Sequence, residues 1–215
     1  MPPDPHLFAG EGERQRRYAR LLIDPATKTL EAFEHDLFFQ AKKFDQLYGD
    51  IQRSFAPMEE TELENLFFQR LVVQSFQSLP IGEPHHEEPF EISVHMIRIE
   101  ATPKSEVGRP APEGIHRDGY HFGSIHLMRR SNLEGAENYI YDLEKNPVKK
   151  VRLEEPMDSI YFDDAAIFHG VSPFAPIDVQ QRATRDMLIL LYQPLAESPQ
   201  RAGKRRILCE YSLAS

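Results

Sequence analysis

The segment 112–119 carries the pattern in this chain that is most able to do chemistry. It reads Pro-Glu-Gly-Ile-His-Arg-Asp-Gly and places His116 and Asp118 two residues apart. In an extended backbone, side chains two residues apart point to the same face. A second imidazole, His169, follows in Ile-Phe-His-Gly. Two imidazoles and one carboxylate on one face of a metal ion leave positions open for substrate and dioxygen, an arrangement that suits Fe(II).

Each part of this pattern has a simpler interpretation. A chain of this composition gives roughly 0.5 His-x-Asp pairs by chance. His169 could be a core histidine bonded to a backbone carbonyl. Asp163 and Asp164 precede it and could compete for the metal, although a turn with two solvated acids explains them as well. His116, Asp118 and His169 are therefore candidate metal ligands, and the simpler interpretations stay open at this point.

A cation opens the apolar stretch 185–193. Arg185 would be costly to bury without a partner, and its planar guanidinium matches a carboxylate through two hydrogen bonds. The adjacent Asp186 points to the opposite face if the segment is extended. Arg182 is the competing candidate, but it lies in the preceding loop, where solvent exposure is expected.

The composition limits the classes of partner. The 215 residues carry a formal net charge of −9, which argues against nucleic acid as the main partner. We interpret the basic runs 14–20 and 201–206 as solvated faces or strand edges. The single Cys209 excludes an intrachain disulfide framework. No apolar run is long enough to span a bilayer and no signal peptide is evident, so we expect a cytoplasmic protein without a membrane partner.

The spacing of apolar residues and turn signals predicts one domain, 1–215, that is mainly β with flanking α. Its elements must position the residues named above. Its first part, 1–89, should contain a strand at 17–23 and two supporting helices at 29–48 and 57–79. Its second part, 90–215, should form a double-stranded β-helix, or jelly roll. The first strand there, 91–100, changes phase at 96–97, which predicts a bulge. Further strands are predicted at 113–118, 122–130, 137–142, 148–153, 157–162, 166–171, 185–193 and 206–213.

The order of the metal and arginine motifs resembles the Fe(II)/2-oxoglutarate-dependent dioxygenases. More narrowly, the chain is similar to the bacterial group that contains free L-amino-acid hydroxylases such as the L-isoleucine 4-hydroxylases. The resemblance covers about residues 90–193 and departs from the family at Met96, where many relatives have Gln, and at Ala136, where Gly is usual. It is carried by the segments 94–98, 112–119, 125–130, 132–137, 168–173 and 185–188.

The resemblance implies a role for each of the residues singled out above. His116, Asp118 and His169 would hold Fe(II), and Arg185 would bind the distal carboxylate of the cosubstrate 2-oxoglutarate. The reaction implied is decarboxylation of 2-oxoglutarate to succinate, coupled to hydroxylation of an unactivated C–H bond. The start of the chain close to the strand at 17–23 implies that an N-terminal segment of the relatives is missing, which leaves completeness of the substrate pocket open.

Two further residues are candidates for binding the substrate. Arg98 could bind a substrate carboxylate, with an external salt bridge as the alternative. Tyr120 follows the metal segment and could cover the site, although packing explains it equally well.

We therefore expect an enzyme that hydroxylates a small molecule, a free L-amino acid in the leading interpretation. Dioxygen is the other substrate, and a homo-oligomer is left open. One alternative is a cupin-like isomerase or a metal-binding module without catalysis. Another is a dioxygenase that acts on a peptide or on a carrier-tethered amino acid.

Overall fold

The computed structural model describes residues 1–7, 13–39, 50–82, 85–199 and 203–212. Its main sheet has eight strands, seven of them in the order β13-β2-β1-β4-β12-β5-β9, while β3 pairs with β1. All neighbours are antiparallel except the parallel pair β1 and β3. The strands are β1 (Glu13–Asp24), β2 (Thr29–Phe33), β3 (Ala56–Pro57), β4 (Phe90–Ala101), β5 (Phe122–Ser131), β9 (Ser159–Asp163), β12 (Ala183–Pro194) and β13 (Arg205–Glu210).

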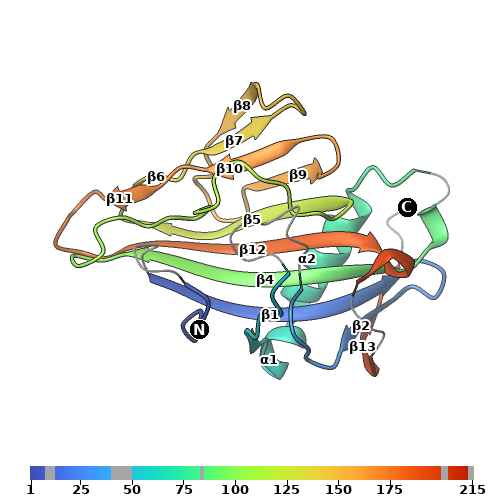
Figure 1. Cartoon of the computed structure of the whole chain (residues 1–215). Coiled ribbons are helices and arrows are strands. Elements are labelled where there is room, and N and C mark those ends of the chain that lie inside the picture. The colour runs from blue at the N-terminus through green and yellow to red at the C-terminus, as the bar shows by residue number, and fades with distance from the viewer. Residues whose placement is uncertain (8–12, 40–49, 83–84, 200–202, 213–215) are drawn as a thin grey trace.

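A second layer covers one face of the main sheet. It consists of a small three-stranded sheet in the order β10-β7-β8 and a separate pair, β11 and β6. Figure 1 shows these strands on one side of the long strands and α2 on the other. The antiparallel layers are consistent with the predicted jelly roll. The strands are β6 (Leu133–Gly135), β7 (Asn138–Tyr141), β8 (Pro147–Val151), β10 (Phe168–Val171) and β11 (Phe174–Pro176).

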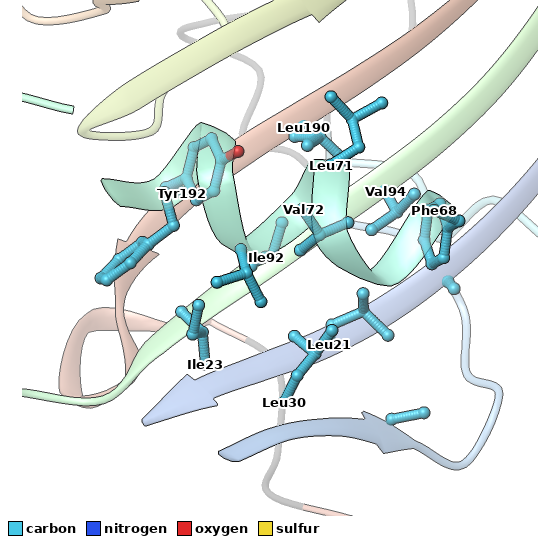
Figure 2. Close-up of a cluster of buried hydrophobic side chains, with 14 of the residues drawn as sticks. Leu21, Ile23, Leu30, Phe68, Leu71, Val72, Ile92, Val94, Leu190 and Tyr192 are labelled. Atoms are coloured by element: carbon cyan, nitrogen blue, oxygen red, sulfur yellow. The ribbon is translucent and has the colours of Figure 1, made fainter. Parts of the chain in front are cut away.

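The helix α2 (Leu66–Gln77) covers the other face of the main sheet. Its first turn is capped by Asn65, whose side-chain oxygen accepts hydrogen bonds from two backbone amides at 2.9 and 3.2 Å. Leu71 and Val72 pack against Ile92 and Leu190 in the core drawn in Figure 2. A short helix α1 (Glu60–Leu63) precedes it, and the turns η1 (His85–Glu87) and η2 (Leu195–Glu197) are 3-10 helices. No described helix is both long and apolar enough to cross a membrane.

Only one of the two predicted supporting helices is found among the described residues. The second, predicted at 57–79, is present as α1 and α2. The first, at 29–48, is wrong where it can be checked: it begins with strand β2, residues 34–39 contain no helix, and 40–48 lie outside the described residues. A turn after β1, in which Lys28 has a φ of +57°, sends the chain back along β1. Strand pairing thus overrides the helical spacing of the apolar residues.

Two smaller predictions about strands are also wrong. No bulge interrupts β4, which pairs in unbroken register with β1 and with β12. Met96 and Ile97 are both apolar because both faces of the main sheet are covered, by α2 and by the second layer. Residues 113–118 form no strand, since Gly114 and Gly119, with φ values of +80° and +84°, turn the chain on either side of the metal segment.

A buried histidine joins α2 to the main sheet and gives folding a pH dependence. His126 on β5 contacts the hydroxyls of Ser75 on α2, Ser124 and Ser159 at 3.2, 3.0 and 2.7 Å. Burial lowers the pKa of His126 to about 4, so the folded protein keeps this ring neutral while the unfolded chain protonates it near 6.5.

We therefore expect stability to fall as the pH drops from 6.5 to 4, because only the unfolded state gains a proton in this window. This group alone should lower the free energy of unfolding by up to about 3 kcal/mol. Denaturant titrations of wild type and His126→Gln across this range test the prediction. The variant should show the shallower pH dependence, and identical slopes for the two proteins would contradict it.

Candidate metal centre and its cavity

Two backbone hydrogen bonds hold the metal segment against β10. The amide of His116 donates to the carbonyl of His169, and the amide of His169 donates back, both at 2.9 Å. A Cβ at position 170, which is Gly, would lie 3.0 Å from the carbonyl oxygen of Gly114, so this close approach favours a glycine here. This bridge brings the two imidazole rings to 4.4 Å between centroids.

Asp118 completes a cluster of three potential ligands. Its Oδ2 lies 3.1 Å from His169 Nε2, and its Oδ1 lies 3.7 Å from His116 Nε2. One donor atom from each of the three residues lies within 4.8 Å of the others. Burial raises the pKa of Asp118, but the neighbouring His169 and His116 outweigh it and hold this pKa below its ordinary value. An ionised carboxylate beside two imidazoles is a donor set for a divalent transition metal.

The orientation of His116 is set by its own loop. Its Nδ1 lies 3.0 Å from the carbonyl oxygen of Gly114, so Nδ1–H donates there and Nε2 presents its lone pair to the cluster. Glu113 Oε1 lies 3.2 Å from the same Nε2. Burial lowers the pKa of His116, yet Glu113 and Asp118 raise it above its ordinary value overall. The surplus of negative charge around this ring favours a bound cation.

Asp164 positions the metal segment, a role that the sequence did not reveal. We expected a solvated turn or a competing ligand, but Asp164 is fully buried directly after β9. Its carboxylate accepts hydrogen bonds from the amides of Asp118, Gly119 and Tyr120 at 3.0, 2.7 and 3.2 Å. Burial, followed by the charge of Asp118, raises the pKa of Asp164. The only signal in the sequence was an acid at the end of a predicted strand.

Replacing this carboxylate should loosen the metal segment. Asp164→Asn keeps the shape but offers a single, uncharged acceptor oxygen to three amides. We expect metal affinity to fall about 10- to 100-fold, as it does when groups that orient metal ligands are removed. Titration calorimetry with Mn(II) measures this, with the exposed neighbour Asp163→Asn as the matched control. Equal affinity in Asp164→Asn and wild type would show that Asp164 does not support the site.

Arg185 reaches from β12 into the cavity that also contains the three potential ligands. The residue is only 3% exposed, its Nη2 lies 3.4 Å from Asn138 Oδ1, and its buried Nε has no hydrogen-bond partner among the described residues. Burial, and then the nearby Arg130, lower the pKa of Arg185 to about 10, so it stays charged at neutral pH. In the described part of the chain no carboxylate forms an ion pair with it. A buried guanidinium in this state has capacity for an anionic ligand.

The competing Arg182 lies outside this cavity. Its Nη1 forms an ion pair with Glu100 at 3.0 Å, and its side chain is more than half exposed. Asp186 points to the opposite face of β12, as the alternation of the strand predicted. Of the two arginines, only Arg185 is positioned to meet a molecule bound at the candidate metal centre.

The two residues suggested for substrate binding also lie outside the cavity. Arg98 is on the face of the main sheet away from the metal cluster, where Nε and Nη2 bond to the Asp186 carboxylate at 2.7 and 2.6 Å. It therefore takes the external salt bridge that was the alternative interpretation. Tyr120 is buried in an apolar cluster with Ile125 and Phe162, which favours packing over covering the site.

The walls of the cavity combine apolar residues with a second group of cations. Arg14 and Arg16 from β1 and Arg53 from the loop before β3 line it, and all three are buried. This corrects the interpretation of the run 14–20 as a solvated face or strand edge, because Arg14 and Arg16 of β1 line the cavity and β1 lies between β2 and β4. The apolar walls are Phe38, Ile97, Ile99, Pro110, Ala111, Ile125, Val171, Met187, Ile189 and Leu191.

Comparison with known families identifies the class of this chain. A sequence model described as 2OG-Fe dioxygenase matches residues 1–191. The chain belongs to the 2OG-Fe dioxygenase family. A search of curated proteins finds no match.

Several solved structures are similar to this chain in fold. A bsmA homolog from Methylobium petroleophilum PM1 is 28% identical, with a TM-score of 0.77 over 91% of this chain and 77% of that one. IDO from Bacillus thuringiensis shares the fold at 21% identity, with a TM-score of 0.71 over 85% of this chain and 75% of that one. The Fe(II)/α-ketoglutarate-dependent dioxygenase TqaL shares it at 20% identity, with a TM-score of 0.64 over 84% and 67% of the two chains.

A 2OG-Fe dioxygenase uses Fe(II) and 2-oxoglutarate, and the residues present fit both. The two imidazoles and the carboxylate of the cluster could hold iron, and the unpaired Nε of Arg185 fits an anionic cosubstrate. Bound iron supplies activation of dioxygen, with 2-oxoglutarate oxidised to succinate and carbon dioxide.

Proposed function

We propose that this dioxygenase hydroxylates an aliphatic C–H bond of a small substrate, a free L-amino acid. His116, Asp118 and His169 are the proposed iron ligands, and Arg185 is the proposed clamp for the distal carboxylate of 2-oxoglutarate. The observation that carries the proposal is the buried Arg185, which shares one cavity with the three potential ligands and forms no ion pair within the described residues.

The lining of the site supports a small substrate. The cavity lies between the main sheet and the second layer, and its walls come from β1, β4, β5, β7, β10, β12 and neighbouring loops. A concave site with mostly apolar walls and a few charged groups is typical of sites for small molecules. The narrower relationship to the L-isoleucine 4-hydroxylases, and one jelly-roll domain over 1–215, are parts of the same proposal. Membership in the dioxygenase family argues against the isomerase and the binding module.

The experiment is a substrate screen under an atmosphere of labelled dioxygen. Protein loaded with Fe(II) and 2-oxoglutarate is incubated with the twenty L-amino acids, and succinate and products are followed by mass spectrometry. We expect at least one amino acid to gain one labelled oxygen atom as succinate accumulates. Labelled product only from peptides or carrier-bound amino acids would contradict the free substrate and support the tethered alternative. Absence of succinate under every condition would contradict the proposed reaction.

A further inference from the structure

Two arginines of β1 form a second cationic site in the same cavity. Arg14 and Arg16 line it, and each is only 9% exposed. The Nε atoms of both are buried and have no hydrogen-bond partner within the part of the chain that the structure describes. Guanidinium groups are seldom buried with unused donors, because the lost hydration is not replaced. The unused donors indicate that a ligand completes the hydrogen bonding at this site.

The strand register separates this site from Arg185. On β1, Arg14 pairs with Ile99 of β4, and Ile99 pairs with Arg185 of β12. Arg14 and Arg185 therefore stand level with each other, two strand spacings or roughly 10 Å apart along the sheet. A 2-oxoglutarate molecule whose distal carboxylate binds Arg185 leaves Arg14 and Arg16 to a different anionic group. One cavity thus offers two separate anion sites beside one metal cluster.

Neighbouring groups hold Arg16 in a fixed direction. Its Nη2 donates to Nδ1 of His95 at 2.7 Å, and Nε2–H of His95 donates to the Ser93 hydroxyl at 3.0 Å. Burial, and then the charge of Arg16, lower the pKa of His95 well below its ordinary value, so the ring remains a neutral acceptor. The guanidinium also lies 4.0 Å from the ring centroid of Phe55. Arg16 is therefore preorganised before any ligand arrives.

Few negative groups near this site balance its charge. The Asp4 carboxylate lies 4.0 Å from Arg16 Nη1, and among the described residues Arg14 Nη2 donates to the backbone carbonyl oxygens of Arg109 and Pro110 at 3.0 and 3.4 Å. Two further acids line the cavity, Glu113 and Asp118, and both lie beside the imidazole of His116. A carboxylate ligand would supply both the missing charge and the missing acceptors.

We propose that Arg14 and Arg16 bind the carboxylate of the substrate and so select carboxylic acids over their neutral derivatives. This inference rests on the proposed function, since it assigns the substrate class of that same site. The carboxylate could belong to an amino acid or to an acid without an amino group, and both would be held through the same two guanidinium groups. Anchoring there places the rest of the molecule between β1 and the metal cluster.

The test compares acids with amides of the same shape. Succinate release is measured for L-isoleucine against L-isoleucinamide, for L-leucine against L-leucinamide, and for 4-methylpentanoate against its amide. Wild type should prefer the acid by about 10- to 100-fold in kcat/KM, the worth of a hydrogen bond to a charged group. The third pair separates amino acids from acids that lack an amino group.

Variants of the two arginines then test whether they cause the preference for acids over amides. In Arg16→Gln the ratio of acid to amide should fall towards one, and in Arg14→Gln it should fall at least several-fold. The ratio of the acid rate to the amide rate is measured within one protein. It therefore does not change if a variant folds less well or binds less iron, because both rates fall equally. The control is Arg17→Gln on the opposite face of β1, where Arg17 pairs with Glu59, and it should keep the wild-type ratio.

The possible results distinguish failure of the carboxylate site from failure of the proposed function. Equal rates with acids and amides in wild type, or a preference unaltered in Arg16→Gln, would overturn the carboxylate site and leave the proposed reaction standing. Succinate release that no acid of the panel stimulates would also overturn it. A wild-type protein that releases no succinate would overturn the proposed function together with this inference.

Discussion

Replacing His169 with alanine should abolish iron-dependent turnover of 2-oxoglutarate. The substitution removes one of three ligand atoms, so only His116 and Asp118 remain and the coordination is too weak to retain Fe(II). We expect affinity for Fe(II) or Mn(II) to fall by at least about 100-fold, and succinate release to fall to background. The fold should persist, because the bridge between 116 and 169 uses backbone atoms.

The matched control for this prediction is His121→Ala. His121 is partly exposed, pairs with Glu197 at 2.9 Å and does not line the cavity, so its loss should leave metal affinity unchanged. Circular dichroism checks that both variants are folded. Metal binding that survives in folded His169→Ala would contradict the assignment and direct attention to Glu113, whose carboxylate lies beside His116.

Replacing Arg185 with glutamine should raise the KM for 2-oxoglutarate by about 100-fold. Two charge-assisted hydrogen bonds from one guanidinium to the distal carboxylate would be lost, and each is worth more than a neutral bond. The melting temperature of the ligand-free protein should not fall, because the substitution removes a buried charge that has no carboxylate partner among the described residues. Weaker cosubstrate binding without lost stability distinguishes a ligand clamp from a structural arginine.

Arg182→Gln, directly before β12, is the matched control. Arg182 is an exposed arginine that pairs with Glu100 outside the cavity, so its variant should keep the wild-type KM for 2-oxoglutarate. Steady-state succinate release at fixed Fe(II) gives both values. If KM rises in Arg182→Gln and not in Arg185→Gln, the clamp has been placed on the wrong residue.

Predictions from the sequence worked where local geometry decides the outcome. His116 and Asp118 come together, although in a loop and not in the strand predicted at 113–118. Arg185 and Asp186 face opposite ways because they are adjacent in a strand. Most of the strands between 122 and 193 were predicted because turn residues bound them, whereas β6 and β11 were not. Such features can be predicted from residues that are close together in the sequence.

The remaining features depend on contacts between segments distant in sequence. The stretch 29–33 has helical spacing, but pairing with β1 and β13 makes it a strand. Asp164 is buried because three amides of a loop about 45 residues earlier surround it. Arg14 and Arg16 resembled a solvated basic run, but β1 lies between two strands with both of its faces covered. No local pattern contains that information.

The most direct measurement is a crystal structure of the protein grown without oxygen in the presence of Fe(II) and 2-oxoglutarate. It should show one iron ion bound by His116 Nε2, a carboxylate oxygen of Asp118 and His169 Nε2. The distal carboxylate of 2-oxoglutarate should lie against Arg185, with Arg14 and Arg16 still free to bind a second anion. Iron bound elsewhere, or 2-oxoglutarate held by Arg14 and Arg16 in place of Arg185, would contradict this account of the site.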